Sequence, residues 1–386
     1  MSVLRSVLND PTSLSHFIHR FTMKELSELA LTSKEFAETV RNAPLRNTET
    51  KVTAPVKWRS LFQSALALRL SPKAPLEELA DLAGSGALTY LEWLSLENHN
   101  MDKPAFPKLV TAFPRLSHLT SLNLTNTHFK GSSDCAALLN ATSPSLTSLS
   151  LWATRGFKFT DLVGVLPRFR HLQHLNVSLH YDDGILSDSM IDVLASFHEL
   201  RELEINGNRI GPEGAVALSY IVTHMPRLRV LKAVFNQMGR PRTGDGGIET
   251  LMAALRACPD LEHLDLKEND FGDVGILSLS PYLSECKALK YLNLSSNKIF
   301  DKDTIDPEDN ILKSPLQVLV ESLPVSLETL YLLETNINEA GIAAFLKKLP
   351  HMKHLKRLDL RIGHSPGKEA IKAKAEEVLP GCTVVL

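Results

Sequence analysis

One cluster of histidine and aspartate side chains has the residue types of a zinc site. His171 and His174 lie three residues apart, and His180 and Asp182 follow closely. Imidazole and carboxylate groups at such spacings can ligate zinc. However, the leucine periodicity of this segment places His171 before a strand, His174 on it and His180 after it, so the three rings do not converge. We therefore expect no metal site here.

Two insertions have the composition of ion-binding loops without their essential residues. The acidic segment 301–309 has Asp306 where a calcium loop needs glycine, and Leu312 stands where it needs glutamate. The segment 239–247 has the two glycines of a phosphate-binding loop, but Asp245 stands in the position of its lysine. We therefore interpret both insertions as solvated loops and expect no cofactor.

The cysteines offer no pattern for disulfides, zinc or nucleophilic catalysis. Cys135, Cys258, Cys286 and Cys382 are far apart and form no Cys-x-x-Cys pair. Cys258 and Cys286 each come three residues before the first leucine of a repeat, a position expected in the core. The sequence also lacks a Gly-x-Ser-x-Gly elbow. We therefore expect no enzymatic activity, and a reducing compartment, the cytoplasm or the nucleus.

Composition and charge exclude several classes of protein. The 386 residues include 42 basic and 44 acidic side chains, a net charge of −2, so a nucleic-acid partner is expected only within a larger assembly. No apolar run approaches the roughly 20 residues of a membrane span, and no secretory signal is evident. The segment 1–21 has Arg5 and Arg20 but a single acid, which leaves mitochondrial import as a less favoured alternative.

A repeating leucine pattern determines the elements that position the remaining polar residues. The pattern Leu-x-x-Leu-x-Leu, with occasional substitutions, recurs in ten copies, usually 28 residues apart and with two insertions. The central leucines are Leu94, Leu122, Leu149, Leu175, Leu203, Leu231, Leu264, Leu292, Leu330 and Leu358. A step of 28 residues back reaches Leu66, and one forward reaches Leu386. We therefore expect about 11 repeats over residues 63–386, with a final capping strand.

Each repeat predicts a strand followed by a helix. The alternation in the first half is that of a half-buried strand, and the second half has helical spacing, as in residues 211–221. Strands stack about 4.8 Å apart whereas helices need about 10 Å, so the α/β solenoid should bend into a horseshoe with a parallel sheet inside. The position after the strand holds an amide that can satisfy the turn in four copies. These are Asn208, Asn236, Asn269 and Asn297; other copies have Thr127, Thr154, His180 or Thr335.

The unit length and the helix entry Gly-x-x-Gly-Ala-x-x-Leu at residues 211–218 resemble the ribonuclease-inhibitor-like class of leucine-rich repeats. The resemblance extends from about residue 63 to the C-terminus. It implies a horseshoe that binds another macromolecule. Because the class includes inhibitors, receptors, ubiquitin-ligase adaptors and GTPase activators, the resemblance leaves the ligand open.

We expect residues 1–45 to form a separate helical module, followed by a linker or cap at 46–62. The module resembles an F-box, although Asp10 replaces its usual leucine. The matching positions are Pro11, Leu14, Phe17, Ile18, Phe21, Leu26, Leu29, Ser33, Lys34 and Phe36. The resemblance implies that Pro11, Leu14, Phe17 and Ile18 dock a Skp-type adaptor of a cullin ubiquitin ligase, while the repeats bind a substrate protein. The alternative is a helical cap over the open end of the repeat core.

The residues beside the strand leucines should line the concave face of the solenoid. Aromatic and arginine side chains at such positions are the types that dominate interface energetics. The expected partner-binding residues are Trp93, Trp152, Glu202, Glu204, Lys232, Tyr291, Tyr331, Arg357 and Arg361. His263, Asp265 and Asp359 share the face, but we do not include them in that set. The sequence therefore favours a protein-protein interaction scaffold, specifically an F-box-like substrate adaptor.

Two other functions use the same architecture. One is a structural subunit of a ribonucleoprotein or cytoskeletal assembly. The other is a GTPase-activating protein similar to the Ran activator, for which Arg155 after a strand is the early candidate. The acidic tail typical of that family is missing, since the sequence ends in Val384-Val385-Leu386. We therefore rank this function last.

Overall fold

The computed structural model describes residues 50–52, 67–70, 75–178, 186–239, 246–300, 304–305, 312–335, 338–361 and 368–385. The chain divides into two compact units, Met1–His174 (unit 1) and Leu175–Leu386 (unit 2). The predicted adaptor-binding residues Pro11, Leu14, Phe17 and Ile18 lie outside the described residues. Within the described ranges, no helix combines the length and apolar character needed to span a bilayer.

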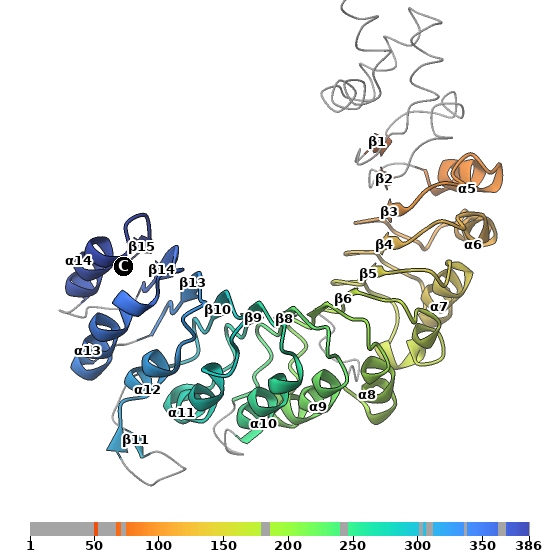
Figure 1. Cartoon of the computed structure of the whole chain (residues 1–386). Coiled ribbons are helices and arrows are strands. Elements are labelled where there is room, and N and C mark those ends of the chain that lie inside the picture. The colour runs from red at the N-terminus through yellow and green to blue at the C-terminus, as the bar shows by residue number, and fades with distance from the viewer. Residues whose placement is uncertain are drawn as a thin grey trace, which may run out of the picture. The chain divides into compact units, whose positions relative to one another are not determined.

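Unit 1 contains parallel strands that pair in chain order. Its strands are β1 (Thr50–Val52), β2 (Ala67–Leu70), β3 (Trp93–Ser95), β4 (Ser121–Asn123), β5 (Ser148–Ser150) and β6 (His174–Asn176), which crosses the unit boundary. Its helices are α5 (Leu76–Gly84), α6 (Phe106–Ala112), α7 (Ser132–Ala141) and the 3-10 helices η3 (Phe113–Arg115), η4 (Phe159–Leu162) and η5 (Leu166–Arg168). Helices α5, α6 and α7 lie on one side of β3, β4 and β5 (Figure 1).

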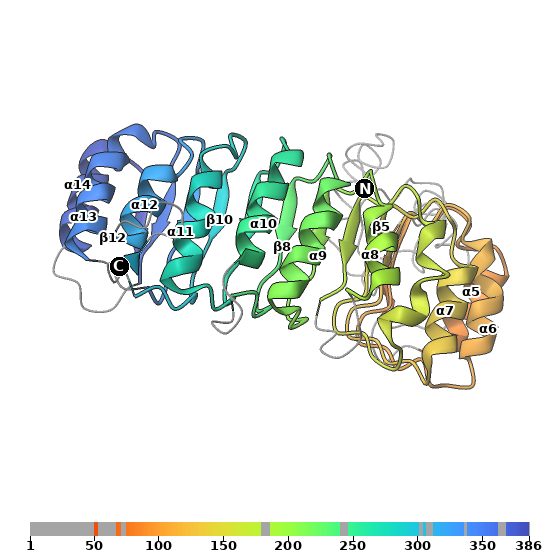
Figure 2. The ribbon, with the colours of Figure 1, turned by 90° about the horizontal axis from the view of Figure 1, so that it is seen from below.

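Unit 2 has the same plan. Its main strands are β7 (Glu202–Glu204), β8 (Val230–Lys232), β9 (His263–Asp265), β10 (Tyr291–Asn293), β13 (Thr329–Tyr331), β14 (Arg357–Asp359) and β15 (Thr383–Val385). Its helices are α8 (Asp188–Ala195), α9 (Gly211–Thr223), α10 (Gly246–Ala254), α11 (Gly272–Leu283), α12 (Pro315–Ser322), α13 (Glu339–Lys348), α14 (Lys368–Val378) and the 3-10 helices η6 (Leu255–Ala257) and η7 (Leu349–His351). Two short antiparallel strands, β11 (Thr304–Ile305) and β12 (Leu312–Lys313), lie between β10 and α12. Figure 2 shows α9 to α13 following one another side by side.

The leucine register is confirmed by strand pairing and burial. Leu231 aligns with Leu264, Leu264 with Leu292 and Leu292 with Leu330, and the side chains of all these leucines are fully buried. Because successive strand residues point to opposite faces, the leucines pack toward the helices while their neighbours face the other way. The α/β leucine-rich-repeat solenoid predicted from the sequence is therefore confirmed.

The two terminal strands differ from the predicted register by two residues. Leu68 aligns with Leu94, where Leu66 was expected, and Val384 aligns with Leu358, where Leu386 was expected. A shift of two residues keeps every side chain on the same face, so leucine spacing alone does not fix these ends. Strand β1, which pairs with β2, lies in the segment interpreted as a linker.

The repeat between β5 and β6 departs from the strand-helix plan. It contains the 3-10 helices η4 and η5 and no α-helix. Gly156 and Gly164 are weak helix formers, and Pro167 removes a backbone donor at the start of η5. The expectation of a full helix in every repeat is therefore wrong here.

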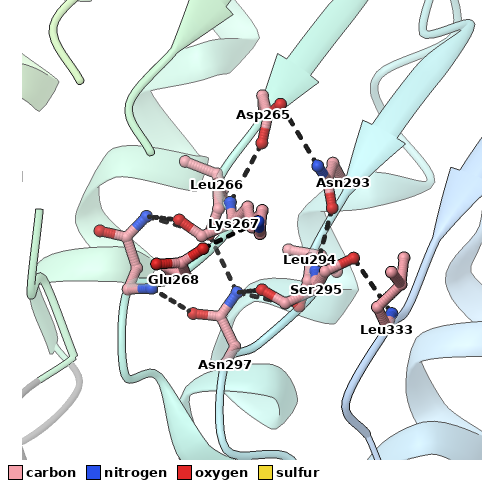
Figure 3. A network of polar contacts seen from close by, with 10 residues as sticks. Asp265, Leu266, Lys267, Glu268, Asn293, Leu294, Ser295, Asn297 and Leu333 are labelled. Carbon is pink, nitrogen blue, oxygen red and sulfur yellow. Dashed lines mark hydrogen bonds and ion pairs between the residues drawn. The ribbon is translucent and has the colours of Figure 1, made fainter. Parts of the chain in front are cut away.

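The buried asparagines satisfy backbone groups as predicted. The Asn297 Nδ2 donates to the carbonyl oxygens of Leu266 and Leu294, both at 2.9 Å, and its Oδ1 accepts from the Asn269 backbone N–H at 2.8 Å (Figure 3). The Nδ2 groups of Asn208, Asn236 and Asn269 likewise each donate to a carbonyl oxygen of the preceding repeat. The Oδ1 groups of Asn236 and Asn269 accept from the backbone N–H of the preceding asparagine. We call these four residues the asparagine ladder; it links each repeat to the one before it.

Candidate interaction surface

The strands of unit 2 present a face opposite its helices. The unit 2 face consists of the first and third residues of β7, β8, β9, β10, β13 and β14 and the residue two positions after each strand. These residues are Glu202, Glu204, Asn206, Val230, Lys232, Val234, His263, Asp265, Lys267, Tyr291, Asn293, Ser295, Thr329, Tyr331, Leu333, Arg357, Asp359 and Arg361. Parallel pairing brings corresponding residues of neighbouring strands side by side.

Two carboxylates share one lysine at the β7 end of this face. The Lys232 Nζ lies 2.6 Å from Glu204 and 3.3 Å from Glu202, and Asn176 donates to Glu204 at 2.7 Å. Burial disfavours the Lys232 charge, but the hydrogen bonds and charges of the two glutamates outweigh it and raise the pKa of Lys232. The lysine therefore remains charged at neutral pH.

A row of planar groups crosses β9, β10, β13 and β14. The rings of His263 and Tyr291 are stacked with centroids 3.8 Å apart and planes 6° from parallel. The Tyr331 ring is tilted against Tyr291 at 5.5 Å, and the Arg357 guanidinium carbon lies 5.4 Å from the Tyr331 centroid. We call these four residues the stacked row. Aromatic and cation–π contacts of this kind hold the side chains in one arrangement.

Burial controls the ionisation of this row. Burial, with a smaller effect of the Lys232 charge, lowers the pKa of His263 to about 4, so the ring is neutral at pH 7. Its buried Nε2 has no hydrogen-bond partner within the described part of the chain. Burial likewise raises the pKa of Tyr291 to about 12. Both stacked rings are therefore uncharged at physiological pH.

Two arginines share one carboxylate at the β14 end. Asp359 has a fully buried side chain and lies 3.1 Å from Arg357 and 3.0 Å from Arg361. The side chains of Arg357 and Arg361 are 40% and 55% exposed. The carboxylate therefore orients two guanidinium groups that remain accessible to a partner.

Acidic and amide side chains fix the centre of the face. Asn293 donates to Asp265 at 3.3 Å, and the backbone N–H of Leu333 donates to Ser295 Oγ at 3.0 Å (Figure 3). Burial, despite hydrogen bonds from the backbone of Lys267 and from Asn293, raises the pKa of Asp265. These bonds tie the polar centre to the backbone of neighbouring strands.

Seven of the nine sequence-predicted binding residues belong to the unit 2 face. Three form the carboxylate-lysine cluster, and four lie along the other end; these residues are Glu202, Glu204, Lys232, Tyr291, Tyr331, Arg357 and Arg361. His263 and Asp359 connect these groups but were not included in the predicted set. The sequence did place both residues on the strands next to those of Lys232, Tyr291 and Tyr331, and this position could have identified them. Their burial could not be predicted, because it depends on side chains of the neighbouring repeats.

The other predicted residues lie in unit 1. Trp93 begins β3, and Trp152, two residues after β5, is 43% exposed. Neither contributes to the unit 2 face. Arg155, the candidate for GTPase activation, is exposed in unit 1, where its backbone bonds to Thr127 at 2.8 Å.

Other candidate chemistry has little support in the described part of the chain. His171 and His174 are exposed, His180 and Asp182 lie outside the described residues, and no group of three potential ligands there could hold a metal ion. Burial raises the pKa of Cys258 to about 12 and of Cys286 to about 11. Thiols with such values are protonated at neutral pH, which fits core packing better than nucleophilic chemistry.

Comparisons with known proteins agree with the repeat architecture. A family model described as Leucine Rich repeat matches residues 198–219 and 257–280. No curated protein matches the chain. An internalin (inlF) from Listeria monocytogenes is similar in structure, with a TM-score of 0.50, 16% identity and coverage of 90% of this chain and 88% of that one.

Two further structures are similar at lower scores. The TLR13-ssRNA13 complex has a TM-score of 0.47 and 17% identity, with coverage of 85% of this chain and 44% of that one. LegL7, a leucine-rich repeat-containing protein from Legionella pneumophila, has a TM-score of 0.44 and 18% identity, with coverage of 83% and 88%. The matched repeats, the strand register and the similarity to the internalin structure agree on a leucine-rich-repeat solenoid fold for this chain.

Proposed function

We propose that this chain is a protein-interaction scaffold that binds a protein partner on the unit 2 face. The observation that carries the proposal is the stacked row, with ring and guanidinium contacts between 3.8 and 5.5 Å. Tyrosine and arginine are the residue types enriched where single side chains dominate binding energy. Side chains already held in place lose little conformational entropy on binding.

The surroundings of the stacked row support this use. The leucines beneath it, including Leu292 and Leu330, are fully buried, so the sheet offers a rigid platform. The guanidinium groups beside it are oriented by the buried Asp359. Rigid aromatic groups flanked by oriented charges favour a specific protein partner over a general apolar one.

We further propose that the scaffold is an F-box-like substrate adaptor of a cullin ubiquitin ligase. The support is the sequence motif, in which Pro11, Leu14, Phe17 and Ile18 occupy the positions that would dock a Skp-type adaptor. The unit 2 face would then bind the substrate. A helical cap remains the alternative role of residues 1–45.

Two double variants of the full chain test both parts. Phe17→Ala with Ile18→Ala should abolish capture of a purified Skp-type protein and retain the partner of the unit 2 face. Tyr291→Ala with Tyr331→Ala should have the opposite effect. Pull-downs with mass spectrometry, with native circular dichroism verified for each variant, measure this.

A matched control removes two aromatic groups elsewhere. Tyr90 and Tyr220 are 58% and 49% exposed and lie off the unit 2 face, so Tyr90→Ala with Tyr220→Ala should change neither capture. If the Tyr291 and Tyr331 variant retains every partner, the unit 2 face is not the binding surface. If the Phe17 and Ile18 variant unfolds the chain without selective loss of a partner, residues 1–45 are a cap.

A further inference from the structure

The unit 2 face has a charge polarity along its strands. Its β7 to β9 part carries three carboxylates, Glu202, Glu204 and Asp265, and two ammonium groups, Lys232 and Lys267. Its β10 part carries none. Its β13 to β14 part carries two guanidinium groups around the single carboxylate of Asp359. The formal charge therefore changes from net negative through neutral to net positive.

Charges beside the unit 2 face partly offset this polarity. The residues just before the strands form a separate row, in which Glu262 lies 2.6 Å from Lys290 and Glu328 lies 2.6 Å from Lys356. Arg201 and Arg229 add two positive charges to this row before β7 and β8, and Arg229 lies 3.9 Å from Glu262. Of the turn residues after the strands, Glu268 follows β9 and lies 2.8 Å from Lys267, and Glu334 follows β13. One acid is thus added near each end, and the reversal of sign is carried by the two ion-pair clusters. Glu202 and Glu204 with Lys232 sum to −1, whereas Arg357 and Arg361 with Asp359 sum to +1.

The spacing of the two ends limits the size of a ligand. Five strand pairings separate β7 from β14, which corresponds to about 24 Å at roughly 4.8 Å per strand. An extended peptide covers this distance in about seven residues.

From this charge complementarity we propose that the unit 2 face binds an extended peptide segment of a protein partner, carrying a basic and an acidic side chain about seven residues apart. The basic side chain lies against Glu202 and Glu204, and the acidic side chain lies against Arg357 and Arg361. The intervening residues pack on the stacked row. The inference rests on the proposed function and adds the chemistry and direction of the ligand.

A random dodecapeptide display library, selected on the immobilised full-length protein, tests the proposal. Selected peptides should carry a basic and an acidic residue six to eight positions apart, with one order along the peptide exceeding the other by roughly fivefold, as expected for two partly exposed ion pairs. The charge-reversed variant Glu202→Lys with Arg361→Glu should select the opposite order. If charge reversal impairs folding, the milder variant Glu202→Gln with Arg361→Gln replaces it. Peptides selected on this variant should show no preference for either order.

Controls separate this inference from the proposed function. Lys347 and Glu376 are exposed on α13 and α14, so Lys347→Glu with Glu376→Lys should leave the wild-type order intact. Peptides that lose binding to Tyr291→Ala with Tyr331→Ala but show no charge order would overturn the inference and retain the proposed function. Peptides that bind that variant equally would overturn both. Sedimentation showing a dimer that Arg361→Glu dissociates would replace the peptide with a second copy of the chain.

Discussion

Each member of the asparagine ladder satisfies backbone groups of two repeats at once. The Asn269 Nδ2 donates to the carbonyl oxygens of Ala233 and Leu266, at 2.8 and 2.9 Å, and its Oδ1 accepts from the backbone N–H of Asn236 at 3.0 Å. All of these groups are far from water, because Asn269 is fully buried. A single amide therefore supports two turns.

We predict that Asn269→Ala lowers the free energy of unfolding of unit 2 by about 3–5 kcal/mol, because it leaves several buried donors and acceptors without partners. Thr335, at the equivalent position, donates a side-chain hydrogen bond to the carbonyl oxygen of Leu332, so Thr335→Val should cost about 1 kcal/mol. Denaturant titration measures both values. Equal, small effects would show that the amide does not support the turns.

His263 gives a prediction for pH. Because its pKa is lowered from 6.5 to about 4 in the folded protein, mainly by burial, the unfolded chain binds more protons between these values. The free energy of unfolding should therefore fall as the pH falls from about 6.5 to 4, by about 1–3 kcal/mol. His263→Phe keeps an aromatic ring for stacking and should remove this part of the pH dependence.

Denaturation of wild type and variant at pH 7 and pH 4.5 measures the difference. A variant at position 263 with an unaltered pH profile would show that the ring is already solvated.

At the scale of elements, backbone conformation determines where the repeat plan fails. Gly156, before η4, has a φ of +91°, and a Cβ there would overlap the backbone carbonyl of Phe129 in the preceding repeat. A Cβ on Gly164 would meet nothing within 4 Å. The two glycines of the helix-poor repeat therefore have different roles.

We predict that Gly156→Ala lowers the free energy of unfolding of unit 1 by about 2–4 kcal/mol, because it combines a left-handed conformation with a backbone clash. Gly164→Ala should change it by less than about 1 kcal/mol. Thermal and denaturant unfolding of the matched pair tests this. A Gly164 variant that is the more damaging of the two would contradict the assigned conformations.

Leucine spacing predicts the elements well because burial of one strand face constrains every second residue. It places Leu264 and its equivalents correctly and identifies Asn269 as a turn amide. It does not fix the terminal strands, where a shift of two residues preserves the pattern, or the contacts of His263 and Asp359. Those contacts depend on which side chains the neighbouring repeats bring alongside, and the two insertions place some neighbouring residues 33 or 38 positions apart in the sequence.

At the scale of the whole molecule, the two compact units should respond separately to core changes. Leu264 is fully buried in β9, between repeats that continue on both sides. We predict that Leu264→Ala costs about 2–5 kcal/mol, as large-to-small core substitutions do, and that the loss spreads to neighbouring repeats of unit 2.

Hydrogen exchange with mass spectrometry measures this response. Exchange should increase in β8, β9 and β10 and their helices, and remain at the wild-type rate in residues 75–141 of unit 1. The exposed Val216 on α9 offers a control, since Val216→Ala should change no region by more than about 0.5 kcal/mol. A cost below about 1 kcal/mol for Leu264→Ala would contradict the strand register.

The asparagine ladder also has a direction, which matters while the chain is being made. Each amide bonds to a carbonyl oxygen of the preceding repeat, 31 residues earlier for Asn236 and 36 for Asn269. In a repeat that has just left the ribosome, a backbone carbonyl oxygen therefore lacks this hydrogen bond until the asparagine of the next repeat has been synthesised. We expect unit 2 to fold during synthesis in steps of one repeat, with the newest repeat the most exposed to chaperones and proteases.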